Sequence, residues 1–144
     1  MKPCVTLKPS ETPFRKRALN SKYLDYLEWV DKVLFGSPFV NEVKTHHEDR
    51  GEVWFLRFDV YFIDNSLLHF RELFVGQEQP FKKTYTYHYQ RADGTIVFRY
   101  DNAPHFPNLP TAPHHKHLGE KDVFAAEAPD LQSVLKEIEA LIEA

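Results

Sequence analysis

Hydrophobic and polar positions alternate with a period of two through much of the middle of the chain. Residues 39–48 and 52–63 are rich in β-forming side chains, with Arg50-Gly51 between them as a turn candidate. The apolar members of the second run share one parity: Trp54, Leu56, Phe58, Val60 and Phe62. Strict alternation is typical of a strand with one buried face. We therefore predict a hairpin whose second strand contributes one face to the core.

Asp64-Asn65-Ser66 follows this strand and is a second turn signal. A three-residue loop at these residues would place Asp59 opposite Arg71. The same register sets Glu72 opposite Phe58 on the apolar face. An unpaired buried carboxylate is costly, so Glu72 requires a partner.

A third hairpin is predicted around Asp93-Gly94, a dipeptide favoured in two-residue β-turns, with Ala92 opposite Thr95. Its register pairs Tyr87 with Tyr100 on one side of the sheet, where aromatic core packing is the simplest interpretation. On the other side it makes His88 a neighbour of Arg99. One face of this hairpin is therefore aromatic, and the other carries groups that can take part in chemistry.

Helical spacing of apolar residues appears at both ends of this strand-rich region. One amphipathic pattern starts at Asn20 or Ser21 and stops before Gly36. Another starts at Pro129, which we expect at the first helical position, and continues to the end. The order predicts a single α+β domain over residues 1–144, an antiparallel sheet meander of about four to six strands packed against N-terminal and C-terminal helices. Residues 1–19 carry three prolines and no periodicity, and we expect them to form an arm.

Residues 102–120 are rich in proline and histidine, including His105, His114, His115 and His117. Proline lacks the backbone N–H that helices and central strands use, so we predict a functional loop over this whole segment. Upstream lies a tyrosine-rich strand. The runs from Arg99 to His105 and from Pro113 to His117, after that strand, resemble the signature of the TumE family of prokaryotic toxins. The resemblance spans roughly residues 21–142 and is distinctive over 85–119.

The resemblance implies a growth-inhibiting toxin that a small cognate antitoxin protein keeps silent, with RNA as the target and cleavage as the damage. Two positions depart from the family pattern: Phe106 stands where a second histidine is common, and Ala112 where an aromatic is common. Because Phe106 occupies that position, catalytic mechanisms that need a histidine directly after His105 are less well supported. A homodimer is compatible with the sequence.

Charge and composition argue against several other classes of protein. The 144-residue chain has a formal net charge of -3, so it is not a basic protein that coats nucleic acid through counterion release. Its single cysteine, Cys4, cannot form an internal disulfide, and no long apolar run suggests a membrane span. We expect a cytoplasmic protein with no membrane association.

Metal-free RNA cleavage needs a base for the ribose 2′-OH and an acid for the leaving 5′-oxygen, and histidine suits both roles. Cations must also balance the charge that grows on the phosphate. We predict one catalytic site lined by His88, Arg99, Asp101, His105, His114, His115 and His117. Lys82, Lys83 and Lys116 are the predicted substrate-binding cations, and no metal or cofactor is expected.

Other interpretations stay open from the sequence. The His88–Arg99 pair can be a solvated cross-strand contact, and Asp101 can cap a turn. His115 and His117 could face one metal ion in an extended chain, which would suit a metal-dependent phosphodiesterase. The leading prediction is a ribonuclease toxin of a type II pair. A non-catalytic inhibitory module that binds protein or nucleic acid is the main alternative.

Overall fold

The computed structural model describes residues 20–144, so the predicted arm at residues 1–19 lies outside the described part. The elements are α1 (Ser21–Phe35), β1 (Val40–Asp49), β2 (Val53–Phe62), β3 (Leu67–Val75), β4 (Phe81–Gln90), β5 (Ile96–Asp101), β6 (His115–Leu118), β7 (Asp122–Ala125) and α2 (Leu131–Glu143). All described strands form one antiparallel sheet in the order β1-β2-β3-β4-β5-β6-β7. The predicted α+β meander is confirmed, with seven strands in place of about four to six.

The extra strands come from the end of the chain. β6 lies within the segment expected to be loop, so that loop is shorter than predicted. Pro104, Pro107, Pro110 and Pro113 all precede β6, and residues 115–118 therefore keep every backbone N–H for pairing. β6 pairs with β5 on one side and with β7 on the other.

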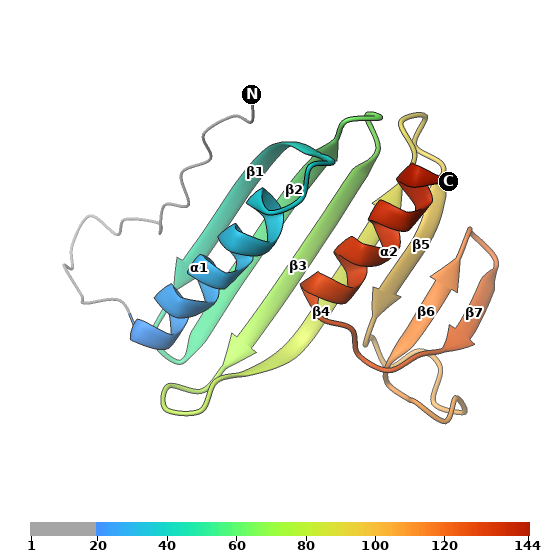
Figure 1. The fold of residues 1–144 in the computed structure, drawn as a ribbon. Coiled ribbons are helices and arrows are strands. Elements are labelled where there is room, and N and C mark those ends of the chain that lie inside the picture. The colour runs from blue at the N-terminus through green and yellow to red at the C-terminus, as the bar shows by residue number, and fades with distance from the viewer. Residues whose placement is uncertain (1–19) are drawn as a thin grey trace.

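Both described helices lie on one face of the sheet, α1 in front of β1 and β2 and α2 in front of β4 and β5 (Figure 1). Asn20 and Asp130 cap them by accepting backbone N–H groups. Asp130 is the N-cap of α2, so Pro129 precedes the cap and is not the first helical residue as predicted. Neither helix is long and apolar enough to cross a membrane.

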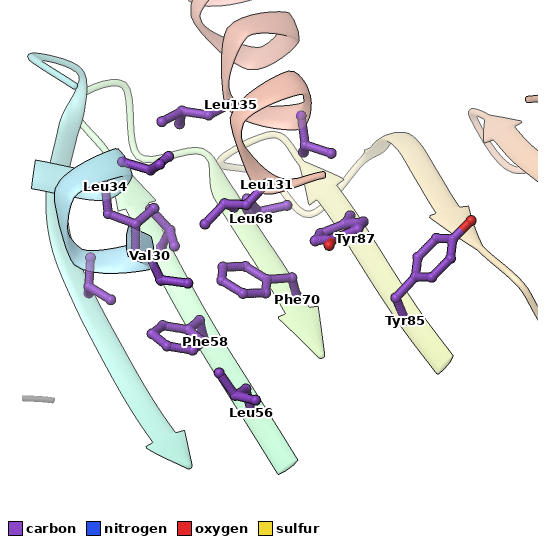
Figure 2. Packing of buried hydrophobic residues seen from close by; sticks show 14 of the residues in the cluster. Val30, Leu34, Leu56, Phe58, Leu68, Phe70, Tyr85, Tyr87, Leu131 and Leu135 are labelled. Carbon is purple, nitrogen blue, oxygen red and sulfur yellow. The ribbon is translucent and has the colours of Figure 1, made fainter. Parts of the chain in front are cut away.

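The core lies between the helices and the even-numbered positions of β2 and β3. Figure 2 shows Phe58 and Phe70 side by side below the helices, and their rings stack at 4.7 Å between centroids. Val30 from α1 and Leu131 from α2 are fully buried above them. Packing of two helices onto one sheet face leaves the other face, here called the open face, free of helical cover from the described residues.

The β2–β3 register differs from the prediction by two residues. The N–H of Phe62 donates to the carbonyl of Ser66, so the three-residue loop is Ile63–Asn65 and begins one residue earlier than expected. Asn65 takes a φ of 66°, the left-handed conformation that this loop type needs. Asp59 consequently pairs with His69, and Arg71 with Arg57. Because the shift is even, every side chain keeps its predicted face.

The β4–β5 register is confirmed, with Tyr87 opposite Tyr100 and His88 opposite Arg99. The turn itself is one residue longer than predicted, because the N–H of Arg91 donates to the carbonyl of Thr95. A bulge between Tyr89 and Gln90 absorbs the extra residue. The pairing closer to the site is therefore unchanged.

Glu72 pairs with Leu56, not with Phe58, and it has the partners that its burial demands. Its side chain accepts hydrogen bonds from the hydroxyls of Tyr26 and Tyr87. Lys82 Nζ lies 2.8 Å from its Oε2 atom. The charge and its hydrogen bonds are thus satisfied on the helix-covered face.

Candidate functional site

Two rows of polar side chains cross the open face, each with one residue from every strand between β2 and β6. The first row is Asp59, His69, His88, Arg99 and His117. The second is Arg57, Arg71, Thr86, Asp101 and His115. Paired positions in adjacent strands share a face and lie about 5 Å apart, so neighbours along each row can interact. The candidate site lies where the rows reach β5 and β6.

Asp101 lies at the centre of this site and is 5% exposed. Its Oδ2 atom is 3.0 Å from Arg99 Nε and 3.6 Å from His117 Nε2. Its Oδ1 atom accepts the N–H of Ala103 at 3.0 Å. A carboxylate with these partners holds the guanidinium and fixes the start of the following loop.

His115 is buried beside Asp101 and is 1% exposed. Its Nδ1 atom lies 2.9 Å from the carbonyl oxygen of Pro113, and a carbonyl can only accept, so the Nδ1 proton is donated there. Its Nε2 atom lies 2.9 Å from Asp101 Oδ1, but not in hydrogen-bond geometry. His115 is therefore a buried neighbour of the carboxylate that makes no hydrogen bond to it, and it is too buried to reach a substrate.

His117 is more accessible. Its Nε2 atom is 3.2 Å from Arg99 Nη2, which can only donate, so Nε2 carries a lone pair in this arrangement. Desolvation and the neighbouring guanidinium lower the pKa of His117, although Asp101 opposes them. A neutral imidazole with an available lone pair is suited to act as a base.

His88 lies on the other side of Arg99. Desolvation lowers the pKa of His88, and the charge of Arg99 lowers it further, against a hydrogen bond with Gln90 that raises it. His88 and Arg99 line a hollow of about 460 Å³ together with His69 and Arg71. Arg99 is thus flanked by His88 from β4 and by His117 from β6.

The loop between β5 and β6 covers part of the cluster with an aromatic ring. The Phe106 ring lies edge-on to His115 at 4.9 Å and to His117 at 5.8 Å between centroids. An apolar ring against two imidazoles excludes water from them. Phe106 thereby shields the site.

The structure does not bring every predicted catalytic residue into this cluster. His105 is exposed on the loop. His114 lies on the helix-covered side, where its Nδ1 atom is 2.9 Å from the hydroxyl of Tyr85. The catalytic roles of His105 and His114 stay predictions. Four of the seven predicted catalytic residues form one connected cluster: Arg99, Asp101, His115 and His117. His88 lies next to Arg99 in the first row.

The predicted substrate-binding lysines also lie away from the cluster. Lys82 pairs with Glu72, and Lys116 Nζ lies 2.6 Å from Glu137 Oε2 of α2, so both charges are used on the helix-covered side. Lys83 is exposed on β4. The open-face cations nearest the cluster are the arginines Arg71 and Arg99 instead. Arg71 was missed because the predicted register paired it with Asp59.

Asp101, His115 and His117 could hold a metal ion, because their ligand atoms lie within 4.8 Å of one another. The bond from His115 Nδ1 to a carbonyl is also common among metal-binding histidines. Arg99 opposes this use, since its guanidinium is 3.0 Å from Asp101 and 3.2 Å from His117. A site that already holds a cation favours an anionic ligand over a metal ion.

Comparison with known protein families finds a match over most of the chain. A family model described as Toxin TumE matches residues 29–143, a range that includes all the strands of the described part and all residues of the cluster. Neither the curated proteins nor the solved structures gave a match to this chain.

Proposed function

The chain belongs to the TumE toxin family, and from that premise we propose that it inhibits growth by cleaving RNA, as the toxin of a type II pair. The observation that carries the proposal is the order His88, Arg99, His117 along one row of the open face. A guanidinium between two imidazoles can bind a phosphate with a proton-transfer group on either side.

The proposed reaction is transfer of the phosphate to the neighbouring 2′-oxygen. His117 Nε2 takes the proton of the ribose 2′-OH, and the 2′-oxygen then bonds to phosphorus. The bond from phosphorus to the 5′-oxygen breaks, and His88 gives this oxygen a proton. The products are a 2′,3′-cyclic phosphate and a free 5′-hydroxyl, and no metal is required.

Charge explains how the two histidines divide these roles. Arg99 donates to His117 in the free protein, and a bound phosphate would draw that donor away and free the lone pair. The same phosphate would favour a proton on His88, whose pKa is lowered in the free protein. Asp101 keeps the guanidinium in place, and the N–H of Ala103 holds the other oxygen of Asp101.

A small antitoxin protein is the proposed partner. β7 is the last strand of the sheet in the described part of the chain, and Phe124 on it is 48% exposed. A strand added to such an edge, or a segment laid over the loop at residues 102–114, would block entry to the site.

A metal-dependent phosphodiesterase is the second candidate, favoured by the three close donors of Asp101, His115 and His117. It differs from the first in one requirement, because cleavage would stop when divalent ions are chelated. Full activity in chelator would exclude it.

The proposed division of roles predicts different responses to the leaving group. On an RNA dinucleotide, His88→Ala and His117→Ala should each lower kcat by about 10²–10⁴-fold. A nucleoside 3′-(4-nitrophenyl phosphate) releases a leaving group that needs no proton. On this substrate His88→Ala should approach wild-type rates, while His117→Ala stays slow.

His46→Ala, which removes an exposed histidine from β1, is the matched control and should leave both rates unchanged. Equal rescue of both variants by the activated substrate would refute the assignment of base and acid.

A further inference from the structure

Arg57 and Arg71 are placed directly opposite each other on adjacent strands of the open face, and both are exposed. Like charges in such a pair destabilise a sheet. Within residues 20–144 no carboxylate lies within ion-pair distance of either guanidinium, and Asp59, the nearest along β2, bonds to His69. Two unneutralised arginines held together at a cost to stability indicate an anionic ligand.

Arg71 also borders both hollows of the open face. The hollow of about 460 Å³ contains His88 and Arg99, and a second of about 470 Å³ runs from Asp101 to Pro104 on one side and to Phe55 on the other. Arg71 and Thr86 line both, so the hollows adjoin and form one groove along β3 and β4. Arg71 lies at its midpoint, two strands across and two residues along from Arg99, or about 12 Å by the usual strand spacing and rise.

The walls of the groove indicate the kind of anion. Phe55 is half-buried in the second hollow, with Leu73 beside it, and offers a flat apolar surface. A groove that combines cations with an aromatic wall suits a chain of phosphates whose bases are free to stack. Bases in a duplex are paired and stacked on each other, so they cannot enter such a hollow.

We infer that Arg71, supported by Arg57, binds a second phosphate of a single-stranded RNA whose scissile phosphate lies at Arg99. The inference rests on the proposed function for the position of the scissile phosphate. The groove then sets the substrate class, because a strand must be unpaired to place one phosphate at each arginine and a base against Phe55.

The test is binding of a short single-stranded 2′-O-methyl oligonucleotide, which cannot be cleaved because its 2′-oxygen is blocked. Arg71→Gln should weaken binding about tenfold, and Arg57→Gln less. The slope of log affinity against log salt should become shallower by about 0.7 for Arg71→Gln, the value for one lost phosphate contact on a single strand. Arg91→Gln, an exposed arginine at the β4–β5 turn, is the matched control and should bind as wild type.

Two further measurements distinguish the loss of a phosphate contact from a loss of folding or of the catalytic step. Arg71→Gln should raise the thermal midpoint of the free protein, because it relieves the repulsion from Arg57, so weaker binding cannot be attributed to unfolding. In cleavage assays the same variant should raise KM about tenfold for a longer strand and leave a dinucleotide unaffected, because a dinucleotide has only the scissile phosphate.

Unchanged binding by Arg71→Gln would overturn the inference, as would equal affinity of wild type for a duplex or no affinity for any RNA. Arginine-dependent binding with no cleavage would uphold the phosphate site and refute the proposed ribonuclease activity. The two claims can therefore fail separately.

Discussion

Neighbouring histidines in this protein have unlike environments, because successive residues of a strand face opposite sides of the sheet. On β1, His46 is exposed, whereas His47 is 1% exposed and bonds to the hydroxyl of Tyr23 in α1. On β6, His115 and His117 reach the open face, and Lys116 between them pairs with α2. The chemistry of each imidazole is thus set by the parity of its position.

His47 predicts how stability depends on pH. Burial lowers the pKa of His47 to about 4 from 6.5. The unfolded chain therefore binds a proton at a higher pH than the folded one, so the contribution of His47 is fully present above pH 6.5 and is lost as pH falls toward about 4. Within this window the free energy of unfolding should fall by up to about 1.4 kcal/mol per pH unit because of this residue.

Urea unfolding of wild type and His47→Gln across this window measures the effect. The variant should show the shallower dependence on pH, whatever its absolute stability, while His105→Gln, which removes an exposed loop histidine, should keep the wild-type slope. Identical slopes for wild type and His47→Gln would contradict the role of His47.

Some of these residues could be placed from the sequence and others could not. The His88–Arg99 pair follows from the alternating pattern and the Asp93-Gly94 turn. The contact of His115 and His117 with β5 does not, because the prolines before them made the whole segment read as loop. Once β6 is known, alternation alone puts these two histidines on one face and Lys116 on the other.

Elements in this fold are joined by polar contacts as well as by apolar packing. The Glu72 carboxylate of β3 links α1 through Tyr26 and β4 through Lys82 and Tyr87. A carboxylate without an accessible surface depends on every one of these partners. Its sequence signal, a charged residue at an apolar strand position, was visible, but its partners come from separate elements and could not be identified.

Lys82→Met tests this link between the elements. The change leaves the buried Glu72 charge without its cation and should lower the free energy of unfolding by about 3 kcal/mol. Lys83→Met, at the exposed neighbouring position, should change it by no more than about 0.5 kcal/mol. Chemical denaturation compares the two.

A second substitution checks the cause. Combining Lys82→Met with Glu72→Met removes the unpaired charge and should recover much of the loss, since an apolar pair of similar volume can replace a buried ion pair. A double variant less stable than Lys82→Met alone would show that the charge is not the reason.

The β2–β3 turn shows how a local error propagates between elements. The loop was predicted one residue too late, and this shifted the predicted register by two residues. The predicted register therefore paired Arg71 with Asp59, whereas the structure pairs Arg71 with Arg57. Each side chain was still assigned to the correct face, because the shift was even. The pairing of Arg57 with Arg71 on the open face, however, could not be predicted from the wrong register. Turn signals in Asp64-Asn65-Ser66 fit either loop, and only the left-handed Asn65 distinguishes them.

At the scale of the whole molecule the sheet separates two tasks. One face packs against α1 and α2 and holds the aromatic core (Figure 2). The other carries the two rows of arginines, histidines and aspartates, with the loop before β6 folded onto its β5–β6 end. Family membership identifies a toxin, and the RNA cleavage that we propose uses groups of the open face.

Turnover of RNA in the presence of chelator tests the central claim most directly. Purified protein at well below the concentration of a mixed cellular RNA substrate should release many 2′,3′-cyclic phosphate ends per molecule, and folded His117→Ala should release them at least about 10²-fold more slowly. Product that never exceeds the protein in amount, or the same turnover by His117→Ala, would contradict histidine-catalysed RNA cleavage and leave an inhibitor that binds without turnover.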